Sequence, residues 1–225
     1  MRQKIINFLS QNKALRWLLW VYHRIIGRSK FIIRGGNYFQ YNNSNIIRCE
    51  IDSGRGTSNS ITIGKTTFIS GSKIKLKGSN NCVVIGSNGF INGLSLTIEG
   101  DNNRVFFGDS IFILDDNRMV VVDGSSLIIG NGCMFSDRID IRTTDNHAIF
   151  DINTDQRINF EEDIIIGDKV WIGTGVNVLK GSVLPNGTIV GARSVVTKKY
   201  EQENSIIVGN PARVVKNNIR WTMER

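Results

Sequence analysis

The feature that most constrains the fold is a six-residue period between Ile164 and Thr197. A glycine directly follows three of the periodic residues, at Gly167, Gly173 and Gly191. A six-residue period fits neither the 3.6-residue turn of a helix nor the two-residue alternation of a strand. It predicts a chain that runs straight, turns a corner and returns, so that three sides make one coil of a parallel β-solenoid. The periodic positions are all branched aliphatic residues: Ile166, Ile172, Val178, Leu184, Val190 and Val196.

This interpretation fixes the stacking of neighbouring coils. Three six-residue sides return the chain to the same place, so Ile166 is predicted to stack on Leu184, and Ile172 on Val190. The aliphatic residue points inward at each side. The glycine after it is expected to relieve the corner, where a positive φ is needed.

A second repeat, with a period of 22 residues, precedes the first and begins at Asn59. Four blocks align without gaps over 59–80, 81–102, 103–124 and 125–146, and a diverged block is expected over 37–58. The additional residues of each coil are expected to bulge at a corner, near Asn80–Asn81 and Asn102–Asn103. The blocks share an apolar residue followed by glycine (Ile63–Gly64, Ile85–Gly86, Phe107–Gly108, Ile129–Gly130) and a second apolar residue six positions after the first (Ile69, Ile91, Ile113, Phe135).

The net charge of +8 comes from the N-terminal segment. Residues 1–34 hold eight Lys and Arg and no acid, and the rest of the chain holds 20 of each sign. Residues 3–27 are predicted to form a basic amphipathic helix with Trp17 and Trp20, which either lies on an anionic lipid surface or caps the open end of the solenoid. Its apolar run Trp17–Tyr22 is far shorter than the roughly 20 residues of a membrane span.

The three cysteines lie far apart, at Cys49, Cys82 and Cys133, without a C-x-x-C pair. This spacing indicates neither a disulfide framework nor a zinc site, and no metal site is expected. A reducing cytosol is the compartment that fits such a chain.

The periodicity breaks over residues 142–163, RTTDNHAIFDINTDQRINFEED, which hold six acids. An irregular excursion from a solenoid is where function usually lies. It contains His147, one of two histidines; the other, His23, belongs to the basic N-terminal segment. A histidine can accept and return a proton at neutral pH, and a carboxylate on its other nitrogen fixes the tautomer. Asp145 and Asp151 are both candidates for that carboxylate.

The hexad segment resembles the hexapeptide-repeat acyltransferases, which are left-handed parallel β-helices. The segment TTDNHAIFD, followed 24 residues after its histidine by Trp171 in VWIG, resembles the active-site segment of bacterial sugar and capsular-polysaccharide O-acetyltransferases, with polysialic acid O-acetyltransferases a close comparison. The resemblance implies that His147 is the catalytic general base and that Trp171 lines the cleft for the acceptor and the donor. From their place in the same loop, Asp145 is expected to act with His147 in catalysis and Asp151 to contact the substrate.

The same resemblance implies acetyl-CoA as a co-substrate, with no tightly bound cofactor. A CoA arm needs backbone amides along its length and cations for its phosphates. The residues that match the donor groove of the family are Gly173, Gly191, Ala192, Thr197, Lys198, Pro211 and Arg213.

The sequence therefore predicts an all-β solenoid, a left-handed parallel β-helix, over 37–204, with a basic helical segment at 1–36. A C-terminal tail follows at 205–225, in which 217–225 end as a short helix or fray. The expected activity is transfer of acetyl from acetyl-CoA to a sugar hydroxyl of a bacterial surface glycan, by a cytoplasmic homotrimer with peripheral contact at the inner membrane face. No nucleic-acid partner is expected. Two alternatives stay open: a small acceptor such as serine, an antibiotic or a nucleotide-linked amino sugar, and a non-catalytic scaffold.

Overall fold

The computed structural model describes Leu18, Val21, Tyr22, Ile25 and residues 27–224. The four separate N-terminal residues are helical. The rest of the predicted basic helix, with Trp17, Trp20 and His23, lies outside the described residues. No helix in the described part of the chain is long and apolar enough to cross a bilayer.

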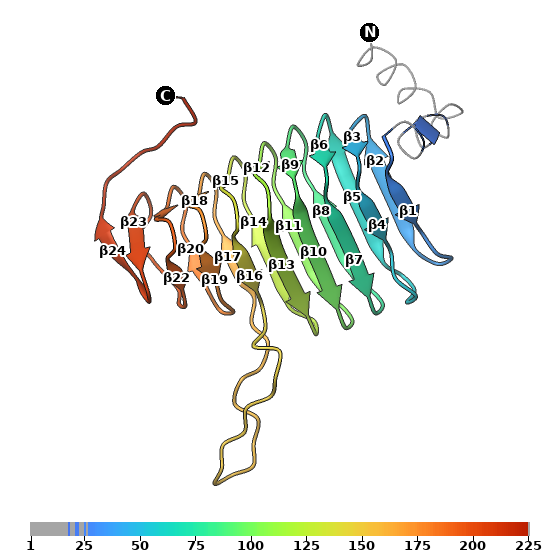
Figure 1. Ribbon diagram of the computed structural model, residues 1–225. Coiled ribbons are helices and arrows are strands. Elements are labelled where there is room, and N and C mark those ends of the chain that lie inside the picture. The colour runs from blue at the N-terminus through green and yellow to red at the C-terminus, as the bar shows by residue number, and fades with distance from the viewer. Residues whose placement is uncertain (1–17, 19–20, 23–24, 26, 225) are drawn as a thin grey trace.

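Residues 27–224 coil into a three-sided parallel β-solenoid, and each turn adds one strand to each of three sheets (Figure 1). Sheet A is β1 (Lys30–Ile32), β4 (Glu50–Asp52), β7 (Lys73–Lys77), β10 (Leu94–Glu99), β13 (Asn117–Val122), β16 (Asp140–Arg142), β19 (Asn177–Val178) and β22 (Val195–Val196). Sheet B is β2 (Tyr38–Asn42), β5 (Ser60–Lys65), β8 (Cys82–Ile85), β11 (Arg104–Phe107), β14 (Ser126–Ile129), β17 (Ile164–Ile166) and β20 (Val183–Leu184). Sheet C is β3 (Asn45–Ile47), β6 (Phe68–Ser70), β9 (Phe90–Asn92), β12 (Phe112–Ile113), β15 (Met134–Phe135), β18 (Trp171–Ile172), β21 (Ile189–Val190), β23 (Ile206–Gly209) and the antiparallel β24 (Ala212–Lys216).

The strand register confirms both predicted repeats. Ile166 pairs with Leu184 in sheet B, and Ile172 pairs with Val190 in sheet C. The 22-residue blocks continue the same two columns, and every member is at most 1% exposed. The sheet B column is Ile63, Ile85, Phe107, Ile129, Ile166 and Leu184; the sheet C column is Ile69, Ile91, Ile113, Phe135, Ile172 and Val190.

The additional residues of the longer coils lengthen strands, and the prediction of a corner bulge is wrong in this respect. In sheet A, β10 has six residues and buries both Leu96 and Ile98, whereas β19 has two and buries only Val178. In sheet B, β11 has four residues and buries Val105 and Phe107, whereas β20 has two. A strand points alternate side chains inward, so two more residues add one more core contact. The N-terminal coils are therefore wider.

A ladder of buried asparagines closes the corner that follows sheet A. The Asn81 amide nitrogen donates to the Gly100 carbonyl at 3.0 Å, and its side-chain oxygen accepts the backbone N–H of Asn103 at 2.9 Å. The preceding Asn80 and Asn102 take the left-handed conformation, with φ of 57° and 63°, which asparagine tolerates better than most residues. The ladder hydrogen-bonds backbone groups that the corner would otherwise bury without partners.

The repeat glycines serve a different purpose from the predicted one. None of Gly64, Gly108, Gly167, Gly173 or Gly191 has a positive φ, so the expectation of corner relief by left-handed backbone is wrong. These glycines leave room for the next coil instead. A Cβ on Gly108 would lie 2.7 Å from the Gly130 carbonyl carbon and 2.8 Å from the Asn131 nitrogen.

Two segments depart from the solenoid. Residues 143–163 form the predicted excursion as a long loop between β16 and β17 (Figure 1). At the C-terminus, β23 and β24 form a hairpin on the end of sheet C. Residues 217–224 contain no helix. Trp221 is held against the solenoid by a hydrogen bond from its indole nitrogen to the Lys169 carbonyl, at 2.7 Å.

Gly108→Ala is expected to lower the free energy of unfolding by about 1–3 kcal/mol, because the added methyl overpacks against the next coil. The measurement is the urea midpoint of the variant against the parent chain. Gly35→Ala is the matched control, since a Cβ there meets nothing within 4 Å. Equal stability of the two variants would contradict the close-approach explanation.

Candidate active site

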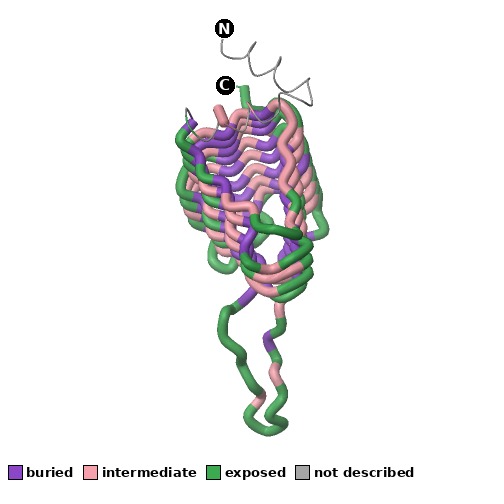
Figure 2. The backbone as a smooth tube through the Cα atoms, turned by 90° about the vertical axis from the view of Figure 1, so that its right-hand side faces the viewer, coloured by how far each residue is buried: buried purple, intermediate pink, exposed green. Residues whose placement is uncertain are grey.

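The loop that carries His147 leaves the solenoid at the edge between sheets A and B. The chain enters it from β16 of sheet A and returns to β17 of sheet B. Figure 2 shows it extending well beyond the three-sided cross-section. Most of its residues, His147 included, are exposed.

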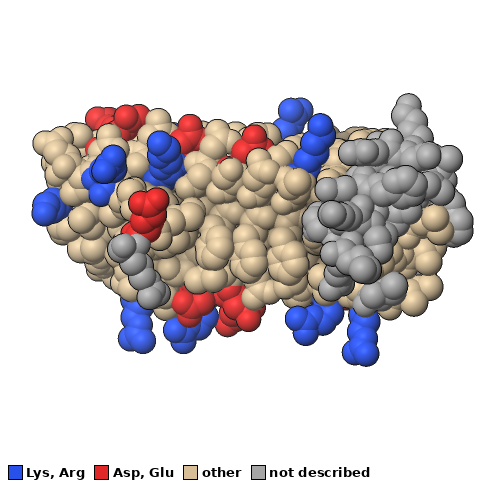
Figure 3. Space-filling view, turned by 90° about the horizontal axis from the view of Figure 1, so that it is seen from above, with Lys and Arg blue, Asp and Glu red and all other residues tan. Residues whose placement is uncertain are grey.

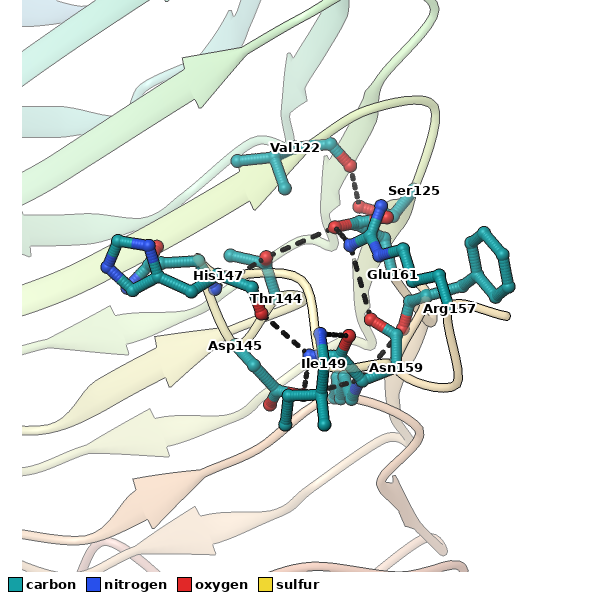
Figure 4. A network of polar contacts seen from close by, with 12 residues as sticks. Val122, Ser125, Thr144, Asp145, His147, Ile149, Arg157, Asn159 and Glu161 are labelled. Carbon is teal, nitrogen blue, oxygen red and sulfur yellow. Dashed lines mark hydrogen bonds and ion pairs between the residues drawn. The ribbon is translucent and has the colours of Figure 1, made fainter. Parts of the chain in front are cut away.

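Asn159 holds the two arms of this loop together. It is one of the few buried residues of the loop, at 8% exposure. Its amide nitrogen donates to the His147 carbonyl at 2.8 Å and to the Asp145 carboxylate at 3.0 Å, while its oxygen accepts the Ile149 N–H at 2.6 Å. These bonds fix the backbone on both sides of His147 (Figure 4).

The base of the loop is tied to the solenoid by Lys180. Its ammonium lies 2.6 Å from the Asp145 carboxylate and donates to the Phe160 carbonyl at 2.9 Å. The hydrogen bond from Lys180 lowers the pKa of Asp145, so the carboxylate stays ionised at neutral pH. Sequence reasoning missed both Lys180 and Asn159, because nothing in their spacing connects them to Asp145.

Asp151 shapes the tip of the loop. Its carboxylate accepts the backbone N–H groups of Asn153 and Thr154, both at 2.9 Å, and the Thr154 hydroxyl at 3.1 Å. The bonds from Thr154 and Asn153 lower the pKa of Asp151. An aspartate that bonds backbone two and three residues ahead makes a tight turn, so the carboxylate is occupied within the tip.

The His147 imidazole takes part in neither of these carboxylate interactions. Its ring points away from the network of Asn159 and Glu161 (Figure 4). The described residues show no hydrogen bond or ion pair to the ring. Only the backbone N–H of His147 donates to the Asp145 carbonyl, at 2.9 Å. Both predicted carboxylate partners are therefore engaged elsewhere, and the ring is free to meet a ligand or a neighbouring molecule.

Trp171 lies on the outer surface of sheet C, as its position before the inward Ile172 predicts. Figure 3 looks onto this face, whose middle is free of charged side chains. The indole of Trp171 packs against Trp221 of the tail, with ring centroids 6.0 Å apart. The Trp171 indole nitrogen is buried and has no hydrogen-bond partner among the described residues. Trp171 continues a row in register across the sheet, formed by Phe68, Phe90, Phe112 and Met134.

A single chain keeps His147 and Trp171 apart. The loop leaves the edge between sheets A and B, and on a three-sided solenoid that edge lies opposite sheet C, which carries Trp171. Figures 1 and 2 show the loop extending away from sheet C. The residues predicted to act together are therefore not brought together within one copy.

The predicted donor residues fall into two groups at the C-terminal coils. Gly173, Gly191 and Ala192 lie at the edge between sheets C and A, beside the β23–β24 hairpin, whose Gly209 N–H donates to the Ser194 hydroxyl at 3.0 Å. Gly173 is needed for packing, since a Cβ there would lie 2.8 Å from the Ala192 nitrogen. Ala192 itself is exposed.

The second group surrounds Tyr200, which closes the last coil. Thr197 and Lys198 follow β22 at the edge between sheets A and B, one coil beyond Lys180. The Lys198 ammonium lies 5.3 Å from the centre of the Tyr200 ring, and the Tyr200 hydroxyl donates to the Ala212 carbonyl at 2.8 Å. Burial raises the pKa of Tyr200, and the nearby Arg213 partly offsets that rise.

Tyr200 thus connects exposed Lys198 with buried Ala212, which lies between the exposed Pro211 and Arg213 of the hairpin. Within the described residues, no three His, Cys, Asp or Glu side chains gather as they would around a metal ion.

Known proteins similar to this chain are acetyltransferases. No protein-family model matches it. It is 37% identical over 102 residues to the polysialic acid O-acetyltransferase of Escherichia coli O1:K1 / APEC, covering 45% of this chain and 33% of that protein. It is 31% identical over 108 residues to the Neisseria meningitidis enzyme of the same name, covering 48% and 50%. These matches span half or less of the curated relatives.

The structural match is more extensive. The polysialic acid O-acetyltransferase OatWY superposes with a TM-score of 0.79 at 30% identity, covering 88% of this chain and 91% of that one. The polySia-specific acetyltransferase NeuO gives the same TM-score at 28% identity, with 87% and 89% covered.

Lys180→Met is expected to loosen the loop without unfolding the solenoid, because it removes the tie to Asp145 and Phe160 while keeping the aliphatic stem. Amide exchange at Ile149 and Ile158 should accelerate roughly 2- to 10-fold, a modest factor because Asp145 is partly exposed. The measurement is hydrogen exchange followed residue by residue at neutral pH. Lys199→Met, which removes an exposed cation from the same edge, is the control and should leave these amides unchanged.

The stabilisation of the loop by the Lys180–Asp145 ion pair should weaken as the pH falls. Since the pKa of Asp145 is lowered in the folded protein, the ion pair contributes fully above the ordinary carboxyl pKa of about 3.9 and is lost as the pH falls through the lowered value. The parent chain and Lys180→Met should therefore converge in acid. A difference that persists in acid would contradict the role of the pair.

Proposed function

The chain belongs to the hexapeptide-repeat acyltransferases, a family of left-handed parallel β-helices, and we propose that it transfers acetyl from acetyl-CoA to a sugar hydroxyl of a bacterial surface glycan. The extensive likeness to two polysialic acid O-acetyltransferases supports the acetyl transfer and the glycan class of acceptor. The observation that carries the proposal is His147, an exposed imidazole on a backbone that Asn159 and Lys180 hold in place.

His147 is the general base of this reaction. A sugar hydroxyl does not ionise unaided at neutral pH, so its proton must leave as its oxygen attacks the thioester carbonyl carbon. The imidazole accepts that proton, the new C–O bond forms and the C–S bond breaks. The imidazolium then returns the proton to the departing thiolate. No covalent acetyl-enzyme is needed, and Asp145 acts by positioning the loop and by its negative charge beside it.

The donor lies along the C-terminal coils. Gly173, Gly191 and Ala192 bring backbone to the surface beside the hairpin, where a pantetheine arm can hydrogen-bond to it. Lys198 and Arg213 supply cations for the phosphates, with Thr197 and Pro211 alongside. Trp171 faces the acceptor and donor, and its unpaired indole N–H is a donor that a bound ligand can satisfy. Asp151, at the loop tip, contacts the acceptor, and no resident cofactor takes part.

The catalytic site is completed by a second copy of the chain, in a homotrimer. His147 and Trp171 lie on opposite sides of one solenoid, so the loop of one copy must reach sheet C of its neighbour. The surface has the apolar character that such an interface needs. Phe106, Ile128 and Ile165 form a row on the outside of sheet B, 40–45% exposed, and Ile152 at the loop tip is 96% exposed.

The enzyme works in the cytoplasm, at the inner face of the membrane. The support is the basic segment 1–34 with its two tryptophans, in which each cation near an anionic lipid surface contributes about 1 kcal/mol. Most of that segment lies outside the described residues.

His147→Ala is expected to lower kcat by roughly 10²–10⁴-fold, the usual contribution of a general base. Folding should be unaffected, because the exposed loop makes few core contacts. The measurement is release of free thiol from acetyl-CoA with oligosaccharide acceptors, with circular dichroism and donor affinity as controls. A folded, donor-binding variant that keeps more than about a tenth of the activity would remove His147 from the mechanism. Transfer only to small amines or antibiotics would overturn the glycan acceptor.

Mixing two inactive variants tests whether the site is shared. In a trimer built from either His147→Ala or Trp171→Ala alone, every site lacks one of the two side chains and should be inactive. After the two are unfolded together and refolded at equal amounts, a head-to-tail ring would regain about a quarter of the parent activity, because some interfaces pair an intact His147 with an intact Trp171. Each variant refolded alone is the control. No recovery in mixed trimers would place the whole site within one chain.

A further inference from the structure

Residues 27–225 carry a net charge of only +3, but this charge is strongly polarised along the solenoid axis. Residues 27–98 hold nine basic and two acidic residues, whereas 99–225 hold 14 basic and 18 acidic ones. In Figure 3, cations project at both edges over the right, N-terminal half, and the visible acids lie at the middle and left. The N-terminal basic segment therefore does not account for all of the uneven charge.

Most of these cations share one surface, which we call the basic face. Outward positions alternate with core residues along the strands of sheet A, and those of β7 are all lysines. Lys30, Glu50 and Lys73 are neighbours in register across three strands, as are Asp52 and Lys75. The basic face consists of Lys30, Lys73, Lys75 and Lys77 on sheet A, with Arg34, Arg48 and Arg55 at its edges.

The three acids among these cations, Glu50, Asp52 and Glu99, do not neutralise the face. Glu50 serves two ammonium groups at once, at 3.3 Å from Lys75 and 3.6 Å from Lys73. Burial would raise the pKa of Glu50, but these two lysines outweigh it and the pKa is lowered. Asp52 is paired with Arg34 at 2.6 Å. Lys77 is paired with Glu99 of β10. Seven cations against three carboxylates leave a net +4 on one flat surface.

The composition of the face decides what it can hold. No large hydrophobic residue of sheet A is among the exposed ones, so the face lacks the apolar groups with which a protein enters a lipid surface. It also offers no aromatic ring on which a nucleic-acid base could stack. Its cations are spread along the solenoid axis, which suits a linear polymer with regularly spaced negative charges.

The face also leads to the loop of the candidate site. The outward row continues from Lys73 through Ser95 and Arg118 and reaches Asp140 in β16, the strand from which the His147 loop departs. From β1 to β16 there are five strand steps, or about 24 Å at the usual strand spacing. A polymer lying along this face would run several sugar units up to the loop base.

We propose that the basic face binds an extended acidic glycan and holds it along sheet A, so that the acceptor is a polyanionic polymer. This rests on the proposed glycan acetyl transfer for its place in the reaction. The binding itself does not depend on it, and it can be measured without acetyl-CoA.

The test compares binding of a carboxylated polymer, polysialic acid, with neutral dextran of equal length by titration calorimetry. The parent chain should bind only the acidic polymer, with an affinity that falls as salt rises. Lys73→Thr/Lys75→Thr should raise Kd about 2- to 25-fold, since exposed charge pairs each contribute a factor of about 1.5 to 5. Glu50→Gln should change Kd in the opposite direction, because it removes the carboxylate that repels the polymer.

The matched control is Lys65→Thr/Arg104→Thr, which removes the same charge from exposed positions on sheet B. Its Kd should stay within about twofold of the parent value if position, and not net charge, decides binding. Equal weakening by both double variants would overturn the proposal. The proposal would also be overturned if Lys73→Thr/Lys75→Thr lost binding to vesicles containing phosphatidylserine while its polymer binding stayed unchanged. The face would then be a lipid contact.

A transfer assay separates this proposal from the proposed function. If both hold, Lys73→Thr/Lys75→Thr raises KM for the acidic polymer and leaves KM for acetyl-CoA unchanged. Polymer binding with the predicted variant pattern but no acetyl transfer would refute the function and leave the basic face standing. Transfer to the polymer with no change in its KM would refute the basic face alone.

Discussion

The close stacking of one coil on the next is the constraint on which this structure depends. Each strand hydrogen-bonds the equivalent strand of its neighbours, and each inward column is an unbroken row of aliphatic or aromatic residues. The corners approach so closely that Gly108 has no room for a Cβ against Gly130 of the next coil. Coil length can change from 22 to 18 residues because a strand can lose two neighbouring residues, one facing inward and one facing outward, without disturbing the columns.

This constraint also determines where chemistry can occur. A coil side offers only outward side chains, so a reactive group needs an excursion, and residues 143–163 supply it. The excursion has almost no core of its own. Its order comes from polar contacts of Asn159 and from one lysine, Lys180, on a neighbouring coil. Such a loop can hold His147 in position while leaving the imidazole accessible.

Sequence periodicity predicted the fold closely, because the columns are regular in sequence as well as in space. It predicted the glycines for an incorrect reason, since close approach and left-handed backbone both favour glycine. It placed the extra residues of the long coils at a corner, because a period alone does not reveal which side is lengthened. Within the site it indicated His147 and the loop, but not Lys180, which meets Asp145 only after a further coil has formed.

The sequence by itself determined the solenoid, its two coil lengths, the excursion and the outward direction of Trp171, because these follow from local alternation and a fixed period. Only the tertiary structure decided which groups meet. It engaged Asp145 with Lys180 and Asp151 with the loop tip, laid Trp221 on Trp171, and separated His147 from Trp171 by the width of the solenoid. The physical reason is that these contacts depend on how successive coils stack. A pattern in the linear sequence does not give the distances between side chains on different coils.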